Sequence, residues 1–184
     1  MLDNNSVMLR CEVLNKLNLD NKEIIVTYSD ALIEKVLDKK NISSKTFLLK
    51  KNDNISLDFV NETLFELNFK RVDYVSEPGE FALRGGLIDV FSYSNDKPYR
   101  IEFFGNKMDS IRTFDVVNQC SIEYLNEVSV LANIQDKSDI NSRQPILSFT
   151  NKDCIFLFEN IDSTIESFEK ANQKFFEKNC SLEI

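Results

Sequence analysis

Five carboxylates lie close together in the sequence between residues 71 and 115, and carboxylates that converge on one point can hold a divalent metal for hydrolysis. They are Glu77, Glu80, Asp89, Glu102 and Asp109. Their positions are typical of turns and of the solvated surfaces of strands, so we interpret them as surface charges. A metal-dependent enzyme is the alternative, and it requires these side chains to meet in the fold.

Two common features of catalytic sites are missing from the sequence. The chain contains no histidine, which removes the commonest general base and the metal sites built on imidazole. It also lacks a phosphate-binding loop of the form GxxxxGK(S/T). Gly85 and Gly86 lie in a strand pattern, where they indicate a bulge or a close approach of two backbones. We therefore expect no catalytic activity, no cofactor and no metal.

Two arginines and one phenylalanine in the same segment favour a different use, as a surface for protein contact. If residues 99–104 form a strand, Arg100 and Phe104 lie on the face opposite Ile101. Arg84 is likewise out of phase with Leu83, so it is expected to point away from the core. Arginine and aromatic side chains are typical anchors of protein interfaces. Ordinary solvated charges are the alternative interpretation of the arginines.

The charge balance argues against a nucleic-acid-binding protein. The net charge is −8, whereas neutralising phosphates requires clustered lysine and arginine. The acidity is uneven, because residues 70–112 carry seven basic and seven acidic side chains. A neutral segment that contains arginine and phenylalanine suits protein contact better than contact with DNA.

The composition is typical of a reducing compartment. Four cysteines are spaced too widely for a metal-binding pair and are expected to be free thiols. No run approaches the roughly 20 apolar residues of a membrane span, and the first residues lack the apolar segment of a secretion signal. We therefore expect a cytoplasmic protein. The cysteines are Cys11, Cys120, Cys154 and Cys180.

These residues need a sheet to position them, and the segment 71–115 predicts one. Short runs that alternate apolar and polar residues are separated by the turn sequences SEPGE, SNDKP and FGNK. This pattern predicts an antiparallel meander. An amphipathic helix is predicted from Leu57 behind Ser56 as its N-cap. Further strands are predicted at TFLLKK, beginning at Thr46, and over 127–131.

Two strand–helix units are predicted on either side of this sheet. The first has a buried strand at 24–27 and a helix from Ser29 that extends to Lys40. The second has a buried strand within DCIFLFEN (153–160) and a helix capped by Asp162 or Ser163. We therefore expect an α+β fold, in which an antiparallel meander with a packed helix is flanked by pieces of a partial α/β layer. The expected divisions are 1–42, 43–132, a linker at 133–149, and 150–184.

The segment RVDYVSEPGEFALRGGLIDVFSYSNDKPYRIEFFGNKMDSIRTFD closely resembles a module that bacterial transcription-repair coupling factors share with the excision-repair protein UvrB. The match is specific because many positions agree at fixed spacing. It departs from the family at Ser92, where proline is usual. The preceding segment SLDFVNETLFELNFKRVD also resembles the family, with Asn68 where glycine is frequent. The agreeing positions are Gly79, Phe81, Arg84, Gly85, Asp89, Phe91, Pro98, Arg100, Phe103, Phe104, Asp109, Arg112, Phe114 and Asp115.

The resemblance implies a function. In this family the module binds the damage-recognition protein UvrA, and the family's binding residues correspond to Arg84, Arg100 and Phe104. The chain would then be a non-catalytic fragment that recruits UvrA in transcription-coupled nucleotide excision repair. Its parent would be an ATP-dependent DNA translocase that binds RNA polymerase and double-stranded DNA through other domains. The alternative is a fragment of a UvrB-type excision nuclease subunit that contacts DNA.

Overall fold

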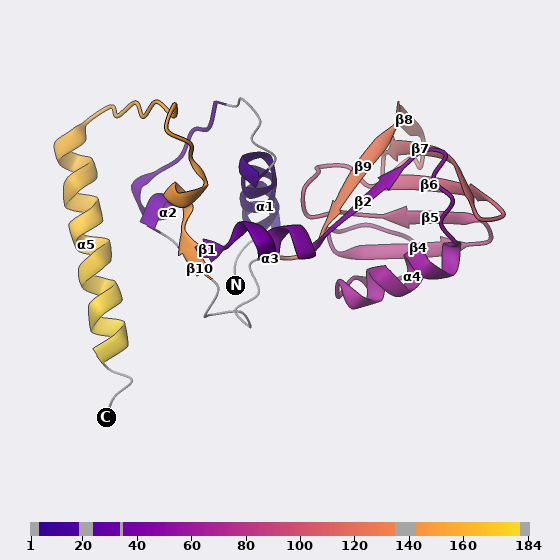
Figure 1. The fold of residues 1–184 in the computed structure, drawn as a ribbon, viewed down its shortest axis with the longest axis horizontal. Helices are drawn as coiled ribbons and strands as arrows, with labels where there is room; N and C mark the ends of the chain where they lie inside the picture. The colour runs from indigo at the N-terminus through magenta and orange to yellow at the C-terminus, as the bar shows by residue number, and fades with distance from the viewer. Residues whose placement is uncertain (1–3, 19–23, 34, 135–142, 181–184) are drawn as a thin grey trace.

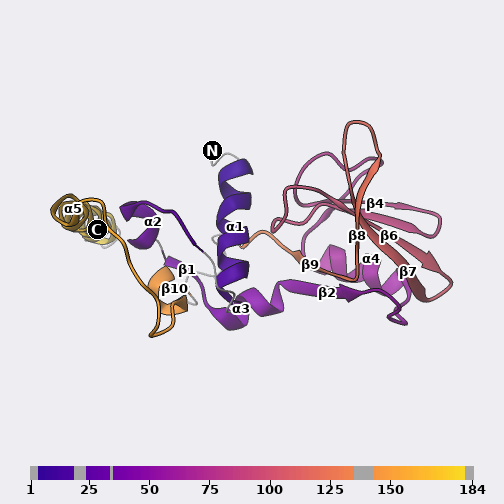
Figure 2. The same cartoon turned by 90° about the horizontal axis from the view of Figure 1, so that it is seen from above.

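The computed structural model describes residues 4–18, 24–33, 35–134 and 143–180. It contains helices and mainly antiparallel sheets, which confirms the expected α+β class. Figures 1 and 2 show a sheet-rich body formed by β2 to β9 and α4, with the N-terminal and C-terminal elements on one side of it. Among the residues described, no helix has both the length and the apolar character needed to cross a membrane.

The predicted meander is the centre of a six-stranded sheet with the order β3-β4-β5-β6-β7-β8. The short β3 pairs in parallel with β4, and all the other pairs are antiparallel. Strands β4 to β8 follow one another in the sequence and in space, so the turns alone set the order of these five strands. The strands are Lys70–Arg71 (β3), Glu80–Arg84 (β4), Leu87–Val90 (β5), Tyr99–Phe104 (β6), Lys107–Phe114 (β7) and Ser121–Leu125 (β8).

The two adjacent glycines form the turn between β4 and β5, and of the two alternatives expected for them the bulge does not form. Gly85 has a φ of +60°, a conformation that glycine adopts without a steric cost. The expected close backbone approach is confirmed at Gly86, where an added Cβ would lie 2.9 Å from the Phe103 carbonyl oxygen. The Phe103 N–H also donates to the Gly86 carbonyl at 2.8 Å. The two backbones are therefore too close for a side chain at position 86.

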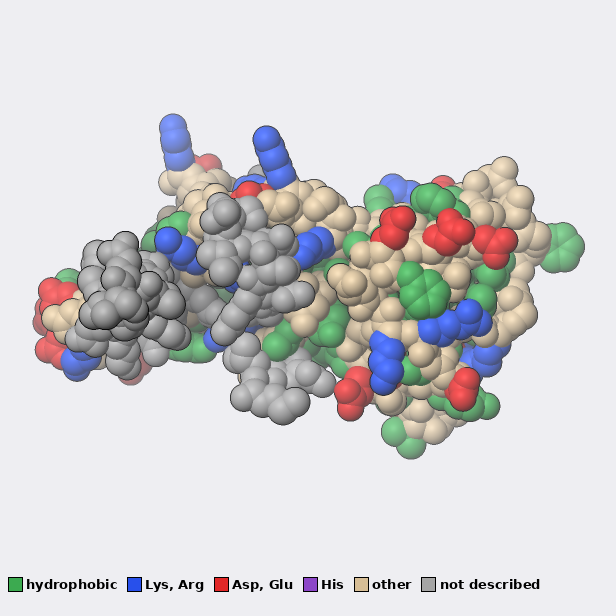
Figure 3. All heavy atoms as spheres, turned by 90° about the horizontal axis from the view of Figure 1, so that it is seen from below, with side chains coloured by type: hydrophobic (Ala, Val, Ile, Leu, Met, Phe, Trp, Pro, Cys, Tyr) green, Lys and Arg blue, Asp and Glu red, His purple; other side chains and the backbone are tan. Residues whose placement is uncertain are grey.

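One face of the sheet is covered by α4 (Leu57–Glu66) and by a separate antiparallel pair formed by β2 (Thr46–Lys50) and β9 (Glu127–Leu131). All three elements were predicted from the sequence. The Ser56 side chain accepts a hydrogen bond from the Phe59 N–H, as expected of an N-cap. Val60 and Leu64 of α4 are completely buried in the core between these layers. Figure 3 shows the side on which α4 lies, where hydrophobic side chains are interspersed with acidic and basic ones.

A second, smaller core joins the N-terminal elements to the segment after residue 142. Strand β1 (Lys35–Leu37) pairs with β10 (Arg143–Pro145). Leu14, Ile42 and Phe149 pack in this core, and Leu131 at the end of β9 also contributes to it. The elements that supply these residues are α1 (Asn4–Asn18), α3 (Lys39–Ser44) and the 3-10 helix η2 (Ile146–Phe149).

The predicted strand–helix unit at 24–40 does not form. Residues 24–28 are not a strand, and Ile24 and Val26 are 96% and 94% exposed. Helix α2 (Ser29–Ile33) has only five residues, and β1 and α3 follow it. A buried strand needs hydrogen-bonded neighbours, and no strand of the described parts of the chain pairs with this segment.

The second predicted unit forms only in part. No strand forms at 153–160, where Ile155 and Leu157 are 83% and 92% exposed. The predicted helix does form, as α5 (Ile161–Cys180), but the Asn160 side chain caps it by accepting from the Ser163 N–H at 3.0 Å.

The segment 133–149 was expected to be a linker, but part of it is folded. It contains β10 and η2, and Phe149 is buried. Residues 135–142 of this segment lie outside the described part of the chain.

Candidate functional site

One face of the six-stranded sheet points away from α4 and its core, and we call it the outer face. The strand register places side chains in rows across it: Arg84 lies in one row with Glu102, and Arg100 lies in the next row with Asp89. Phe104 is two residues beyond Glu102 on the same strand and therefore on the same face. This confirms the expectations that Arg100 and Phe104 lie on one face and that Arg84 points away from the core, and the register places all three on the outer face.

Phe104 is the most exposed aromatic residue of this face. Its side chain is 85% exposed, whereas Phe103 packs against the core and Ile101 is completely buried. A bulge between β6 and β7 does not disturb this alternation, because Phe103 pairs with Met108 while Asp109 is the extra residue on β7. An apolar ring that protrudes from a regular strand costs little in the fold and is available for contact.

The hairpin that carries Phe104 is fixed by backbone hydrogen bonds along its free edge. Segment 52–54 pairs with the start of β7, on the edge of β7 that faces away from β6. The Asn52 N–H donates to the Met108 carbonyl at 2.9 Å, and the Met108 N–H donates to the Asp53 carbonyl at 3.0 Å. An isolated bridge also joins Asn54 to Lys107. Phe104 is therefore presented on an ordered backbone, which lowers the entropy lost on binding.

Asp89 is the centre of the polar part of the outer face. Its side chain is 1% exposed and forms ion pairs with both Arg84 and Arg100. A buried carboxylate requires such partners, because an unpaired charge in the interior is costly. We had interpreted Asp89 as a solvated surface charge, and this interpretation is wrong. Ala82, its neighbour on β4, is fully buried in a small apolar cluster with Val75 and Phe91.

Almost all hydrogen-bond donors of Arg100 are bound within the fold. Its Nε and Nη2 donate to the two Asp89 carboxylate oxygens at 2.7 and 2.9 Å. Its Nη2 also donates to Gln119 Oε1 at 2.7 Å, and its Nη1 donates to the Gln119 carbonyl at 3.2 Å. The guanidinium lies 4.2 Å from the centroid of the buried Phe114 ring. Only 12% of the side chain is exposed, so little of Arg100 is available to a partner.

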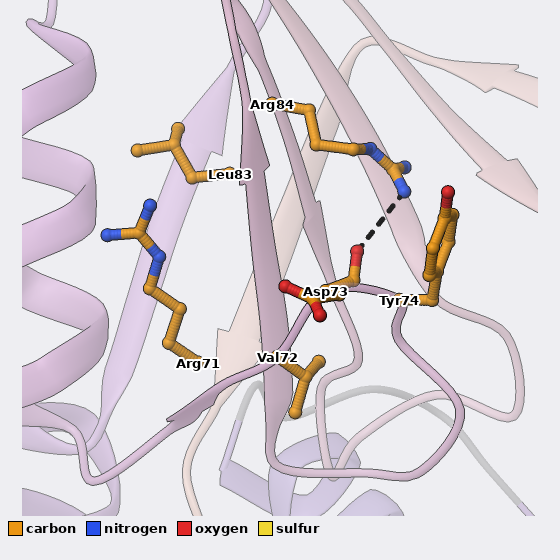
Figure 4. A pocket seen from close by; sticks show the side chains of 6 residues that line it. All are labelled: Arg71, Val72, Asp73, Tyr74, Leu83 and Arg84. Carbon is orange, nitrogen blue, oxygen red and sulfur yellow. Dashed lines mark hydrogen bonds between the residues drawn. The ribbon is translucent and has the colours of Figure 1, made fainter.

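Arg84 differs from Arg100 in its exposure. It pairs with Asp89 and makes a long hydrogen bond of 3.4 Å to the Asp73 carbonyl. Its guanidinium lies 5.0 Å from the centroid of the Tyr74 ring, which is itself 69% exposed. Figure 4 shows Arg84 and Tyr74 on the same side of β4, with Leu83 on the other side. They border an open pocket of about 690 Å³ at the edge of the sheet.

Glu102 forms a second ion pair on the outer face. Its Oε1 accepts from Arg112 Nη2 at 2.6 Å, and its Oε2 accepts from Ser110 Oγ at 2.9 Å. These hydrogen bonds from Arg112 and Ser110 lower the pKa of the Glu102 carboxyl to about 2. The Arg112 guanidinium also lies 5.8 Å from the centroid of the Tyr124 ring.

The five carboxylates considered at first do not gather into a metal site. Asp89 and Glu102 are paired with arginines, and Glu80 accepts from the backbone N–H groups of Ser76 and Glu77. Within the described ranges, no three acidic, cysteine or histidine side chains are close enough together to hold a metal ion.

Sequence reasoning missed the roles of Asp89 and Tyr74. A signal for Asp89 was present, because it is the only charged residue in the apolar run LIDVF and strand pairing could place it beside Arg100. Tyr74 gave no such signal, because it lies outside the regular strands and reaches Arg84 only through the path of the loop.

Comparison with known proteins places this sheet in a family. Residues 47–135 match the family described as the UvrB interaction domain. The chain is 35% identical over 122 residues to the transcription-repair-coupling factor of Bacillus subtilis (strain 168), and 30% identical over 122 residues to that of Escherichia coli (strain K12). Each match covers 66% of this chain, and the chain spans 10% and 11% of these two relatives. The resemblance seen in the sequence is confirmed: residues 47–135 belong to the UvrB interaction domain family.

Proposed function

We propose that this chain is a non-catalytic docking module that binds UvrA through the outer face of its six-stranded sheet. Residues 43–132 form the interaction domain in this proposal, and 1–42 and 150–184 flank it. The observation that carries the proposal is Phe104, an 85% exposed ring on a firmly held hairpin. Covering such a ring in an apolar pocket of the partner contributes about 1.5–3 kcal/mol.

Arg84 supplies the polar part of the contact. It lies two strands and two residues away from Phe104, a separation of roughly 12 Å from the standard spacing of a sheet. Its side chain is 35% exposed, and some of its N–H donors make no hydrogen bond to the described residues of the chain. We infer that a carboxylate of UvrA pairs with these donors in a bidentate manner. We therefore expect the complementary surface of UvrA to contain an apolar pocket for Phe104 with a carboxylate beside it for Arg84.

The alternative of a DNA-contacting module is less well supported. Phosphate binding needs free cationic side chains, yet Arg100 and Arg112 are already paired with Asp89 and Glu102. The net charge of −8 also argues against binding to DNA, because it repels the phosphate backbone.

The proposal extends to a larger protein. The relatives are about ten times longer than the region they share with this chain. We propose that the parent is an ATP-dependent DNA translocase in transcription-coupled repair, which binds RNA polymerase and double-stranded DNA through other segments. In that setting the outer face recruits UvrA to a stalled polymerase.

The proposal is tested by titrating UvrA from the same organism with the chain in a calorimeter. We expect binding by the unaltered chain. Phe104→Ala and Arg84→Ala should each weaken it by about 2 kcal/mol or more, which is about thirtyfold in Kd.

Phe59→Ala is the matched control. Phe59 is 52% exposed and lies on α4, on the opposite side of the sheet. We expect its removal to leave the Kd unchanged. Absence of binding by the unaltered chain, or equal Kd values for all variants, would contradict the proposal. Circular dichroism of each variant verifies that it is folded.

A further inference from the structure

We propose that Asp89 is a positioning residue of the docking face, and that Arg100 supports binding only through Asp89, while Arg84 makes the contact. This inference rests on the proposed function, and it assigns different roles to two arginines that the family resemblance treats as equivalent. It also adds a residue, Asp89, that faces no partner directly because it is buried.

The use of hydrogen-bond donors separates the two arginines. A guanidinium has five N–H donors. In Arg100, four of them are bound to Asp89 and Gln119. In Arg84, two are bound, one to Asp89 and one to the Asp73 carbonyl over a long distance. A bidentate contact with a partner carboxylate is therefore possible for Arg84, whereas Arg100 would first have to break its own bonds.

The aromatic neighbours show the same division. Arg100 lies over Phe114, which is completely buried. Arg84 lies over Tyr74, which is 69% exposed. One arginine is therefore held between a carboxylate and the interior, and the other between a carboxylate and the surface.

Asp89 connects the two. Gln119 holds the Arg100 guanidinium, and Arg100 in turn fixes the direction of the Asp89 carboxylate. The Asp89 Oδ2 atom then accepts a hydrogen bond from Arg84 Nη2. Without Asp89, only the Asp73 carbonyl and the Tyr74 ring restrain Arg84. Its long side chain would regain rotamers, and ordering them again would weaken binding.

A double-mutant cycle tests this inference. The Kd for UvrA is measured for the unaltered chain, Asp89→Asn, Arg84→Ala and the double variant. We expect each single change to weaken binding at least tenfold, and the double variant to bind within twofold of Arg84→Ala. Additive losses, or an unchanged Kd for Asp89→Asn alone, would overturn the inference.

Arg100→Lys provides a second cycle in case Asp89→Asn does not fold. It keeps the charge but cannot reproduce the forked contact with Asp89 and Gln119. We expect it to weaken binding in the unaltered background and to have no further effect in the Arg84→Ala background. Additive losses here would likewise overturn the inference.

Arg112→Lys is the matched control for these cycles. Arg112 is the cross-strand neighbour of Arg100, but it pairs with Glu102 and not with Asp89. Any effect of Arg112→Lys on the Kd should add to that of Arg84→Ala. If UvrA fails to bind the unaltered chain, the proposed function fails and the inference with it. If UvrA binds but the cycles are additive, the inference alone fails.

Discussion

The six-stranded sheet and the C-terminal segment differ in how far they bury similar apolar side chains. Ile101 and Ile111 are completely buried in the sheet, whereas Ile155 and Leu157 are 83% and 92% exposed. Both segments contain runs of apolar residues of the length of a strand. The difference is that residues 99–104 have hydrogen-bonded neighbours on both sides, while no strand of the described chain pairs with residues 154–158.

Burial of an apolar strand therefore depends on hydrogen-bonded neighbouring strands and not on the residue type alone. A strand can leave water only when its backbone groups are paired. The ion pairs of the two regions differ as well: Asp89, which pairs with Arg84 and Arg100, is 1% exposed, whereas Lys170 and Glu166 form an exposed pair 3.8 Å apart on α5.

The largest difference between the two regions should appear on charge reversal. Arg100→Glu places a second carboxylate against the buried Asp89 and should lower the free energy of unfolding by about 4 kcal/mol. Lys170→Glu reverses a charge in the exposed pair of α5 and should change it by less than about 0.5 kcal/mol. Urea unfolding followed by circular dichroism measures both. Similar losses for the two variants would refute the contrast.

Removal of apolar side chains should give the next largest difference. Ile101→Ala leaves a cavity in the main core and should cost about 3 kcal/mol of unfolding free energy. Ile155→Ala removes the same atoms from an exposed position and should cost less than about 0.5 kcal/mol. The urea midpoints of the two variants provide the measurement, and a large loss for Ile155→Ala would show that its segment is buried after all.

The helix caps give a smaller difference. Ser56→Ala removes the cap of α4, which packs on the main core, and should lower the unfolding free energy by about 1 kcal/mol. Asn160→Ala removes the cap of α5 and should reduce the helical signal at 222 nm without shifting the urea midpoint of the sheet. If Asn160→Ala moves that midpoint as far as Ser56→Ala does, α5 unfolds together with the sheet.

The smallest effect is the acid sensitivity that Glu102 gives to the sheet. Its pKa is about 2 in the folded chain against an ordinary value of 4.5. A lowered carboxyl pKa stabilises the fold above pH 4.5, and this stabilisation is lost as the pH falls towards 2. Because the side chain is 40% exposed, we expect no more than about 1 kcal/mol. In Glu102→Gln, stability should fall less steeply over this pH range, and parallel curves would exclude a role for Glu102.

The sequence predicts the sheet well because its pairing is local. Strands β4 to β8 are joined by short turns, and alternation within each strand places Arg100 and Phe104 on the same face. The packing of α4 was also predictable from Ser56 and from the spacing of Val60 and Leu64.

Long-range pairing was not predictable in this way. Strands β2 and β9 are about 80 residues apart, and β1 and β10 about 110, so periodicity cannot reveal that they meet. Arg100, the partner of Asp89, is itself held by Gln119 in the turn between β7 and β8 and by Phe114 at the end of β7, and alternation within a strand does not reveal these contacts. The apolar runs at 24–27 and 153–160 resemble buried strands because composition does not show whether a neighbouring strand exists.

The most direct test of the docking face is site-specific photo-crosslinking to UvrA. The photoreactive residue p-benzoylphenylalanine replaces Phe104 on the outer face or, in a second variant, Phe59 on α4. Both positions hold an exposed phenylalanine, and the sheet separates them. We expect a crosslink to UvrA from position 104 and none from position 59. A crosslink from position 59 alone, or equal crosslinks from both positions, would contradict this expectation.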